Sequence, residues 1–297
     1  MQDEKIKSGM VAIVGPPNAG KSTLMNALLG QKISIVTPKP QTTRNRIIGI
    51  LNDPAYQIVM LDTPGLHKAR KPLNLEMVKI AVSSLAEVDV VLFLIDVSLP
   101  MPEKQAQAVE YLDSSSIPAI LVLNKIDLLP KAQILPIIEV YRNIYPFAAI
   151  VPVSAFLKRG TDTLLQAILR LLPAGPRLYP EDIPTDASER FIVGEIIREK
   201  IFLLTEQEIP YSTAVVIDSF KEDEKKALVT IHATIVVEKS SQKAIIIGSK
   251  GAKLQQIGKN ARQDIERLLA QRVLLKLWVK VHKNWTKDMR FIRDLGL

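Results

Sequence analysis

The sequence predicts an α/β protein with a doubly wound, mostly parallel sheet, followed by a smaller α+β domain. Short apolar runs alternate with helix-length segments up to about residue 172, which is typical of a parallel sheet covered on both faces. Prolines at 173, 176, 180 and 184 then end this alternation. Beyond them, two segments alternate in the manner of half-buried strands. We therefore expect a first domain at 1–175, a proline-rich linker at 176–187 and a second domain at 188–297.

The expected strands of the first domain are continuous apolar runs. They lie at 10–15, 56–65, 90–98, 119–127 and 149–155. Segments with spaced apolar residues separate them and predict helices at 21–30, 73–86, 103–115, 131–145 and 161–172. Because parallel strands end at one edge of a sheet, polar motifs that follow these strands are expected to meet there.

The second domain is expected to run helix, strand, strand, short helix, loop, long helix, strand. Its first helix is predicted at 188–205, its strands at 212–220, 227–237 and 273–282, and its long helix from about 250 to 272. In the last strand the apolar odd positions from Val273 to Val281 form one face. Trp278 lies on the other face, where we expect it to serve in packing.

Composition excludes several classes of protein. A length of 297 residues suits two domains, and 47% hydrophobic with 24% charged residues indicates a globular chain rather than a disordered one. The chain has no cysteine, which excludes disulfides and thiolate metal sites. Neither a signal peptide nor an apolar run of membrane-spanning length is present, so we expect a soluble, cytoplasmic protein.

Positive charge is concentrated at the C-terminal end. Residues 239–297 hold 14 Lys or Arg and 4 Asp or Glu, a balance of +10, although the whole chain carries only +8. The first 238 residues are therefore slightly acidic, at −2. This asymmetry suggests an acidic polymer or surface as a partner, although a solvated basic face would produce the same pattern.

A glycine-rich loop follows the first apolar run. Residues 15–22 read GPPNAGKS, which matches GxxxxGK[ST] in the strand–loop–helix context that a phosphate-binding loop requires. We expect backbone N–H groups to surround a polyphosphate, Lys21 to meet its β- and γ-phosphates, and Ser22 to ligate Mg²⁺. The expected nucleotide contacts here are Gly15, Pro16, Pro17, Asn18, Ala19, Gly20, Lys21, Ser22 and Thr23.

Two further motifs indicate which base is bound. Asp127, in the sequence NKID, can accept hydrogen bonds from the N1–H and exocyclic amine of guanine, which adenine does not offer. Asn124 can brace the loop, Lys125 can lie along the purine, and the backbone of VSA at 153–155 can contact the guanine oxygen. GTP is therefore favoured over ATP, with expected contacts from Asn124, Lys125, Asp127, Ser154 and Ala155.

The motif DTPG at 62–65 ends the second apolar run. We expect Asp62 to hold Mg²⁺ through water and the Gly65 N–H to bond the γ-phosphate and respond to its loss. The nucleotide contacts expected in this stretch are Asp62, Thr63, Pro64, Gly65 and Leu66. Between this motif and the glycine-rich loop, a threonine of QTTRNR, either Thr42 or Thr43, could reach both Mg²⁺ and the γ-phosphate.

A second glycine loop follows the sequence IIIG, but it lacks the spacing and the Lys-Ser of a nucleotide site. Its GxxG lies between a short and a long helix in an order that resembles a type II KH domain, where such a turn lets backbone approach single-stranded RNA. Nearby cations could neutralise phosphates, and IIIG could form an apolar groove floor. The expected RNA contacts are Ile247, Gly248, Ser249, Lys250, Gly251, Lys253, Lys259 and Arg262. In the tail, Trp285 and Phe291 either stack on bases or pin the tail to the body, and we favour the second.

These motifs resemble those of the translation-factor-related GTPases and, more closely, those of the Era family of ribosome-assembly GTPases. The resemblance is carried by GPPNAGKSTLMNALLG, QTTRNR, LDTPGLH and the C-terminal half, so it covers nearly the whole chain. It implies GTP hydrolysis and binding to the 3′ end of small-subunit ribosomal RNA during assembly of the small subunit. The chain is expected to be a monomer.

The resemblance also refines the expected chemistry. Relatives place the metal-ligating threonine immediately before an arginine, which favours Thr43, so Lys21, Thr43 and Gly65 are the expected catalytic residues and Ser22, Thr43 and Asp62 the metal ligands. Leu66 stands where Ras-type enzymes carry a water-positioning glutamine, which implies slow intrinsic hydrolysis. Asn18 stands where some relatives hold K⁺ near the phosphates, so K⁺ is a second candidate cofactor.

Two other functions remain open at this point. A membrane-surface GTPase could use its basic C-terminus to bind anionic lipid, in part at the inner face of the cell membrane. The cations, however, surround the GxxG pattern and do not lie on a clear amphipathic helix. The other hypothesis is a GTP-hydrolysing enzyme with a purely structural second domain, and it leaves both GxxG and the basic tail without a role.

Overall fold

A computed structural model describes residues 6–66, 71–99, 109, 112, 117–223, 225 and 227–297. Two compact units make up the chain. The first comprises Met1–Ser34, Thr43–Arg70 and Asn74–Asp186, and the second comprises Ile35–Thr42, Lys71–Leu73 and Ala187–Leu297. The chain therefore enters the second unit briefly between Ser34 and Thr43 and again at Lys71, before its main part begins.

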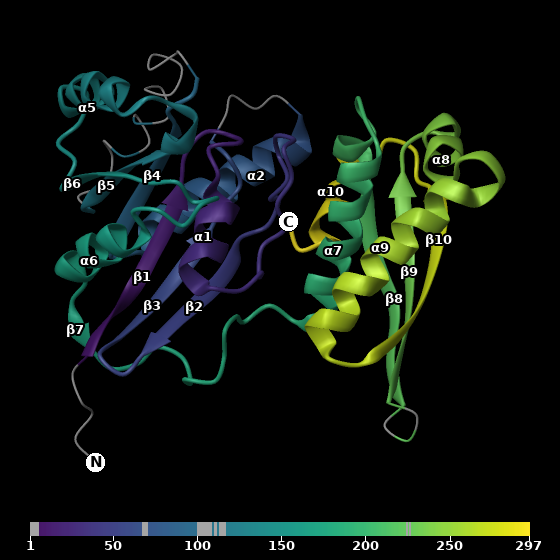
Figure 1. Cartoon of the computed structure of the whole chain (residues 1–297). Coiled ribbons are helices and arrows are strands. Elements are labelled where there is room, and N and C mark those ends of the chain that lie inside the picture. Colours follow the sequence, from purple (N-terminus) through teal and green to yellow (C-terminus); the bar gives the residue numbers. More distant parts are fainter. Residues whose placement is uncertain are drawn as a thin grey trace. The chain divides into compact units, whose positions relative to one another are not determined.

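The first unit is built on a mostly parallel sheet, as predicted. Its order is β2-β3-β1-β4-β5-β6, in which only β2 of this path runs antiparallel, and β7 pairs with β1 (Figure 1). The strands are β1 (Ile6–Val14), β2 (Ile47–Asp53), β3 (Tyr56–Asp62), β4 (Val90–Asp96), β5 (Ala119–Asn124), β6 (Ala149–Pro152) and β7 (Ala174–Gly175). Every residue of β4 and β5 is buried, because helices cover both faces of the sheet.

The helices described in the first unit follow the expected alternation. They are α1 (Lys21–Leu29), α2 (Pro72–Ser83, which begins in the second unit), α5 (Ile134–Arg142) and α6 (Thr161–Leu171). The helix expected at 103–115 falls almost wholly outside the described residues. The edge strand β2 was not predicted. It forms a hairpin with β3 through the short turn at 54–55.

The proline-rich segment differs from the predicted linker. It belongs to the first unit as far as Asp186 and lies along the edge formed by β2 and β3. Ile50 N donates to Pro184 O over 2.8 Å, and the Gln57 side chain donates to Tyr179 O over 2.8 Å. Proline lacks an N–H but keeps its carbonyl, so a proline-rich stretch can still accept hydrogen bonds from a neighbouring strand.

The main part of the second unit has the predicted order of elements. They are α7 (Glu189–Leu204), β8 (Ala214–Asp223), β9 (Leu228–Val237), α8 (Ser240–Ile247), α9 (Ala252–Leu269) and β10 (Arg272–Val281). The sheet order is β10-β9-β8, with β10 parallel and β8 antiparallel to β9. Figure 1 shows α7 and α9 on the same side of this sheet, where their isoleucines pack on the odd positions of β9.

The C-terminal tail is anchored, as favoured above. Trp285 is fully buried, and its Nε1 donates to Ser212 O over 2.8 Å. The Phe291 ring, in α10 (Met289–Asp294), lies 5.7 Å from the Trp285 ring. Trp278 departs from expectation, because half of its side chain is exposed, although its ring makes an edge contact with the His232 ring.

No helix in the described part of the chain is both long enough and apolar enough to cross a bilayer.

Candidate functional site

The first glycine loop connects β1 to α1 at the carboxyl edge of the sheet. Gly15 has a φ of 144°, and a Cβ there would lie 2.2 Å from Leu94 O, so no larger residue fits. Gly20 has a φ of 96° and supplies no side-chain cap to α1. The first N–H groups of α1 are therefore presented without a competing side chain, which suits an anion.

Lys21 lies inside this loop. Its Nζ donates to Gly15 O over 3.1 Å and to Pro16 O over 2.9 Å, so the side chain curls back toward the loop backbone. Burial lowers the pKa of Lys21 to about 8, although the charge of Asp62 opposes this effect. A bound polyphosphate would supply the anionic partner that favours the charged amine.

Three oxygen-bearing side chains converge beside Lys21. Ser22 Oγ donates to Asp62 Oδ2 over 2.6 Å and lies 2.9 Å from Thr43 Oγ1. Asp62 is fully buried, burial raises its pKa, and its Oδ1 has no hydrogen-bond partner in the described chain. An unpartnered buried carboxylate oxygen beside two hydroxyls is a donor set of the hard kind that Mg²⁺ prefers, so these residues fit that metal. Thr42 turns away and bonds to Thr37.

The guanine motif is joined to the phosphate loop through Asn124. Its Nδ2 donates to Ala19 O over 2.7 Å, and its Oδ1 accepts from Ala155 N over 3.0 Å. Asn124 is 2% exposed, so one buried amide links the loops after β1, β5 and β6. Asp127 is exposed in the turn that follows, where an incoming base could reach it.

Asp96 at the end of β4 is a site residue that the sequence analysis missed. Lys125 has a left-handed backbone, and its Nζ forms a short ion pair with Asp96 Oδ2. Asp96 Oδ1 also accepts from Ser98 N over 2.9 Å. A carboxylate at the carboxyl end of a buried strand, in the sequence LIDVS, is the signal that could have found it. This ion pair positions the lysine that we expect along the purine.

The DTPG motif packs directly against the glycine loop. Thr63 Oγ1 donates to Ile13 O over 2.9 Å, and Leu66 N donates to Gly15 O over 3.0 Å. A Cβ on Gly65 would lie 2.9 Å from the backbone of Pro17, so the two loops touch. Leu66 is 3% exposed, which leaves its side chain in the core and away from any attacking water. Residues 67–70, which follow this motif, lie outside the described residues.

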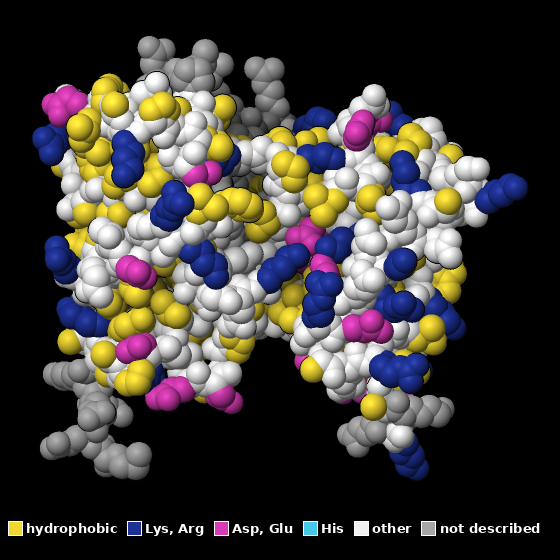
Figure 2. All heavy atoms as spheres, viewed as in Figure 1, with side chains coloured by type: hydrophobic (Ala, Val, Ile, Leu, Met, Phe, Trp, Pro, Cys, Tyr) yellow, Lys and Arg dark blue, Asp and Glu magenta, His cyan; other side chains and the backbone are white. Residues whose placement is uncertain are grey.

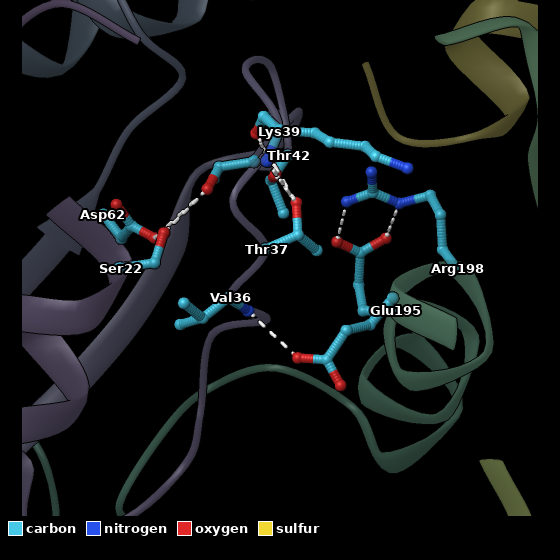
Figure 3. Close-up of polar contacts among 10 residues, drawn as sticks. Ser22, Val36, Thr37, Lys39, Thr42, Asp62, Glu195 and Arg198 are labelled. Atoms are coloured by element: carbon cyan, nitrogen blue, oxygen red, sulfur yellow. Dashed lines mark hydrogen bonds and ion pairs between the residues drawn. The ribbon is translucent and has the colours of Figure 1, made fainter. Parts of the chain in front are cut away.

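Ile35–Thr42 belongs to the second unit and is held by α7 (Figure 3). Val36 N donates to Glu199 Oε1 over 3.0 Å, and Lys39 Nζ donates to Phe202 O over 2.5 Å and also to Thr205 O. Thr43, the next residue along the chain, belongs to the first unit. One peptide bond therefore joins a residue of the expected metal site to a segment fastened on α7.

The second glycine loop has a positive φ at three of its four residues. Gly248 and Gly251 have φ values of 71° and 81°, and Lys250 between them also has a left-handed backbone. A Cβ on Gly251 would meet nothing within 4 Å. The turn therefore presents glycine backbone at the start of α9, with Ser249 and Lys250 exposed beside it.

A groove of about 800 Å³ runs from this turn between α9 and β10. Three of the expected RNA contacts line it, namely Gly251, Lys259 and Arg262. The other five are not among its lining residues, namely Ile247, Gly248, Ser249, Lys250 and Lys253. Ile247 packs instead against the core of the second unit, because α8 turns that face inward. The remaining lining residues were not predicted from the sequence, and they are Ala252, Leu254, Gln255, Gln256, Gly258, Leu274, Leu275 and Leu277.

The lining residues of the groove that lie on α9 could have been predicted from the sequence. Positions 252, 255, 259 and 262 recur at helical spacing and so share one face. The β10 contribution depends on which strand lies beside α9, which no local pattern encodes. Figure 2 shows several Lys and Arg side chains over the part of the second unit where α9 lies.

The fold and these sites define a P-loop GTPase joined to a KH domain. Residues 10–125 match the family described as 50S ribosome-binding GTPase, and residues 208–286 match the KH domain. GTPase Era of Geobacter metallireducens is 51% identical over 296 residues, covering 100% of this chain and 99% of that protein.

Two solved structures resemble the whole chain, each with a TM-score of 0.95, 42% identity, and coverage of 98% of this chain and 99% of the other. One is an Era variant of Aquifex aeolicus bound to GDP and AlF4⁻, and the other is Era in complex with MgGDPNP and nucleotides 1506–1542 of 16S ribosomal RNA. The chain belongs to the Era family of GTPases.

Replacing Asp96 by Asn should weaken guanine nucleotide binding. The substitution keeps the shape of the side chain but removes the charge that holds Lys125, and hydrogen bonds to charged groups contribute about 1.5–3 kcal/mol. We expect the Kd for GDP, measured by calorimetry with Mg²⁺, to rise about 10- to 100-fold. Asp162→Asn, at an exposed acid in the first turn of α6, is the matched control and should leave the Kd unchanged. An unaltered Kd in Asp96→Asn would show that Lys125 needs no such anchor.

Proposed function

We propose that this GTPase is a switch whose output is the binding of single-stranded RNA, with the 3′ end of small-subunit ribosomal RNA as its target during assembly of that subunit. The observation that carries the proposal is the groove beside the GxxG turn, lined by Lys259, Arg262 and two exposed glutamines. The relative solved with 16S ribosomal RNA, alike over 98% of this chain, supports the same target.

In the nucleotide site, each residue has a role that follows from its placement. Lys21 would leave the loop carbonyls to neutralise the β- and γ-phosphates, and Gly65 N–H would bond the γ-phosphate. Ser22, Thr43 and Asp62 would hold Mg²⁺, which when bound neutralises charge that develops on the phosphate oxygens. Leu66 cannot orient water by hydrogen bonding, so hydrolysis by the chain alone is slow.

K⁺ beside Asn18 is part of the proposal. Asn18 lies exposed in the phosphate loop with a left-handed φ of 62°, and an amide oxygen is a suitable ligand for a cation near the phosphates. We expect faster GTP hydrolysis in KCl than in NaCl at equal ionic strength, measured by phosphate release. Asn18→Gly keeps the backbone conformation and should lose the advantage of K⁺. Equal rates of the unaltered chain in the two salts would dispose of the K⁺ site.

The RNA groove combines backbone, charge and polar side chains in the way that single strands require. Bare backbone at Gly251 permits close approach, and the cations of α9 face the path of the phosphates. Gln255 and Gln256 each offer a donor and an acceptor to base edges. The leucines of β10 form the apolar wall against which bases can rest.

A pair of substitutions at Gly251, one charged and one neutral, tests RNA binding directly. Asp and Asn are isosteric, both tolerate the left-handed backbone, and the space around this Cβ is open. Gly251→Asp should weaken the binding of an oligoribonucleotide at least tenfold in fluorescence anisotropy, because it places a negative charge against the phosphates, whereas Gly251→Asn should change it little.

For the unaltered chain, phosphate contacts from four cations (Lys250, Lys253, Lys259 and Arg262) predict a slope of about −3 for log K against log salt concentration.

The same two variants separate RNA from membrane as the partner. In a second measurement, the unaltered chain and both variants are titrated with anionic phosphatidylserine vesicles, and vesicle binding is compared with RNA binding. Vesicle binding without RNA binding would support a membrane-surface GTPase in place of the proposal. Binding of neither would leave the second unit with a structural role and would equally contradict it.

Nucleotide state can reach the groove through residues already described. Glu199 accepts from Val36 N and also pairs with Lys200, whose Nζ reaches Asp264 on α9. Glu199 is 2% exposed, so its ion pair with Lys200 is buried and sensitive to displacement. A shift of Thr43 on loss of the γ-phosphate would pull on Ile35–Thr42 and hence on the two helices. By linkage, nucleotide and RNA would then affect each other's affinity equally.

Removing the Lys39 contact should weaken this coupling. Lys39 donates to carbonyls at the C-terminal end of α7, which otherwise lack helical partners. We expect the RNA Kd to differ between the GDP form and a form loaded with a non-hydrolysable GTP analogue by about 5- to 150-fold. In Lys39→Ala this ratio should move toward one, whereas Lys131→Ala, at an exposed lysine of the first unit, should preserve it. Identical RNA affinity of the unaltered chain in both nucleotide states, by calorimetry, would end the proposed switch.

A further inference from the structure

The face of the second sheet opposite α7 and α9, here called the outer face, carries an ordered row of side chains. On β10 the even positions point to this side, and all of them are exposed, namely Arg272, Leu274, Lys276, Trp278 and Lys280. The odd positions pack toward the helices. Two cations therefore flank the tryptophan at the same two-residue spacing, about 6.6 Å apart along the strand on each side.

Trp278 is held in position but not covered. It lies opposite Thr234 in the register of β9, and its ring contacts the His232 ring edge-on at 5.3 Å. Half of the side chain remains exposed. Farther along the same face, Val236 is only 4% exposed, so the outer face is closed at that end and open around Trp278.

The two edges of this face differ in charge. Cations alternate along β10, which is an edge strand, whereas β8 at the opposite edge carries mixed charge, with Asp218, Lys221 and Asp223. Asp218 is engaged, because it accepts from Thr234 Oγ1 over 2.8 Å. The stripe that contains Trp278 is consequently basic on both sides of the ring.

The basic stripe is continuous with the RNA groove. Leu274 both lines the groove and belongs to the outer row. A strand that leaves the groove over this edge would next meet Lys276 and then Trp278. About four nucleotides occupy a KH groove, so a longer single strand must leave it on one side or the other.

The chemistry of the row favours a polyanion over an apolar partner. Leu274 and Trp278 are separated by a lysine, so the exposed apolar surface is broken rather than contiguous. Alternation of cations with an exposed aromatic ring is the arrangement by which proteins hold single strands, with phosphates on the cations and a base stacked on the ring.

We propose that the outer face is a second contact for single-stranded RNA, in which a base stacks on Trp278 while Lys276 and Lys280 meet the adjoining phosphates. This inference rests on the proposed function of the groove, which it extends by several nucleotides across the β10 edge.

Tryptophan fluorescence can report on this contact separately from the groove. Of its two tryptophans, Trp285 is fully buried and Trp278 is half exposed. In the full chain loaded with Mg²⁺ and a GTP analogue, a 12-nucleotide single strand should quench tryptophan emission, and a 4-nucleotide strand confined to the groove should not. Trp278→Phe removes the reporter, so the quench should vanish while affinity for the longer strand is retained by stacking on phenylalanine.

Affinity measurements complete the test. Trp278→Ala and Lys276→Glu should each weaken binding of the 12-nucleotide strand by about tenfold, the scale of one stacked base or one lost phosphate contact, and leave the 4-nucleotide strand unaffected. Arg170→Glu, which makes the same change in charge at an exposed position of α6, should change neither.

Three outcomes are distinguishable. Quenching by the longer strand alone, together with loss of its extra affinity in Trp278→Ala, establishes the second contact. Equal affinity of both strands for Trp278→Ala and for the unaltered chain overturns it and leaves the groove intact. If neither strand binds the unaltered chain, or if Gly251→Asp binds both normally, the groove proposal has failed and the outer-face inference fails with it.

Discussion

The nucleotide site depends on one constraint, which is that the parallel strands of the first unit all end at the same edge. Loops that are far apart in sequence must therefore meet, and a single buried amide then ties them together. Asn124 donates to Ala19 O and accepts from Ala155 N, so the loops after β1, β5 and β6 share one hydrogen-bonding group. Phosphate and base recognition are joined in this way into one rigid surface, which is what differential binding of a transition state requires.

The contact between Ile35–Thr42 and α7, both in the second unit, is of a different kind. Ile35–Thr42 is held by α7 through backbone and lysine hydrogen bonds, and Glu199 continues into an ionic chain with Lys200 and Asp264. Such chains add little net stability, because desolvation offsets the attraction, but they specify geometry. A contact of this type suits a switch, since it can change arrangement without large loss of apolar burial.

The two glycine loops use the same property of glycine for different ends. In the first loop, Gly15 makes room for the backbone carbonyl of Leu94, so that the turn can fold tightly around an anion. In the second, Gly251 faces open space and keeps side chains away from an approaching strand. Backbone freedom is common to both, whereas the surroundings decide whether a compact triphosphate or an extended polymer fits.

Local sequence patterns were enough to predict the fold class of both units and most residues of the nucleotide site. The alternation of apolar runs, the proline cluster and the period-two strands gave the class of both units, and GxxxxGK[ST], NKxD and DTPG named the residues that the structure brings together. These signals are readable because strand, turn and helix preferences act over a few neighbouring residues. The edge strand β2 and the docking of 176–186 along it were beyond such signals, since partners far along the chain define them.

Tertiary structure alone decided which distant side chains meet. The ion pair of Lys125 with Asp96 joins residues 29 positions apart, and the bond from Val36 to Glu199 joins residues 163 apart. It placed Thr43 rather than Thr42 beside Ser22, moved Ile247 out of the groove and exposed Trp278 on an open sheet face. Each depends on strand order and helix packing, which follow from burial summed over the whole unit and from no single stretch of residues.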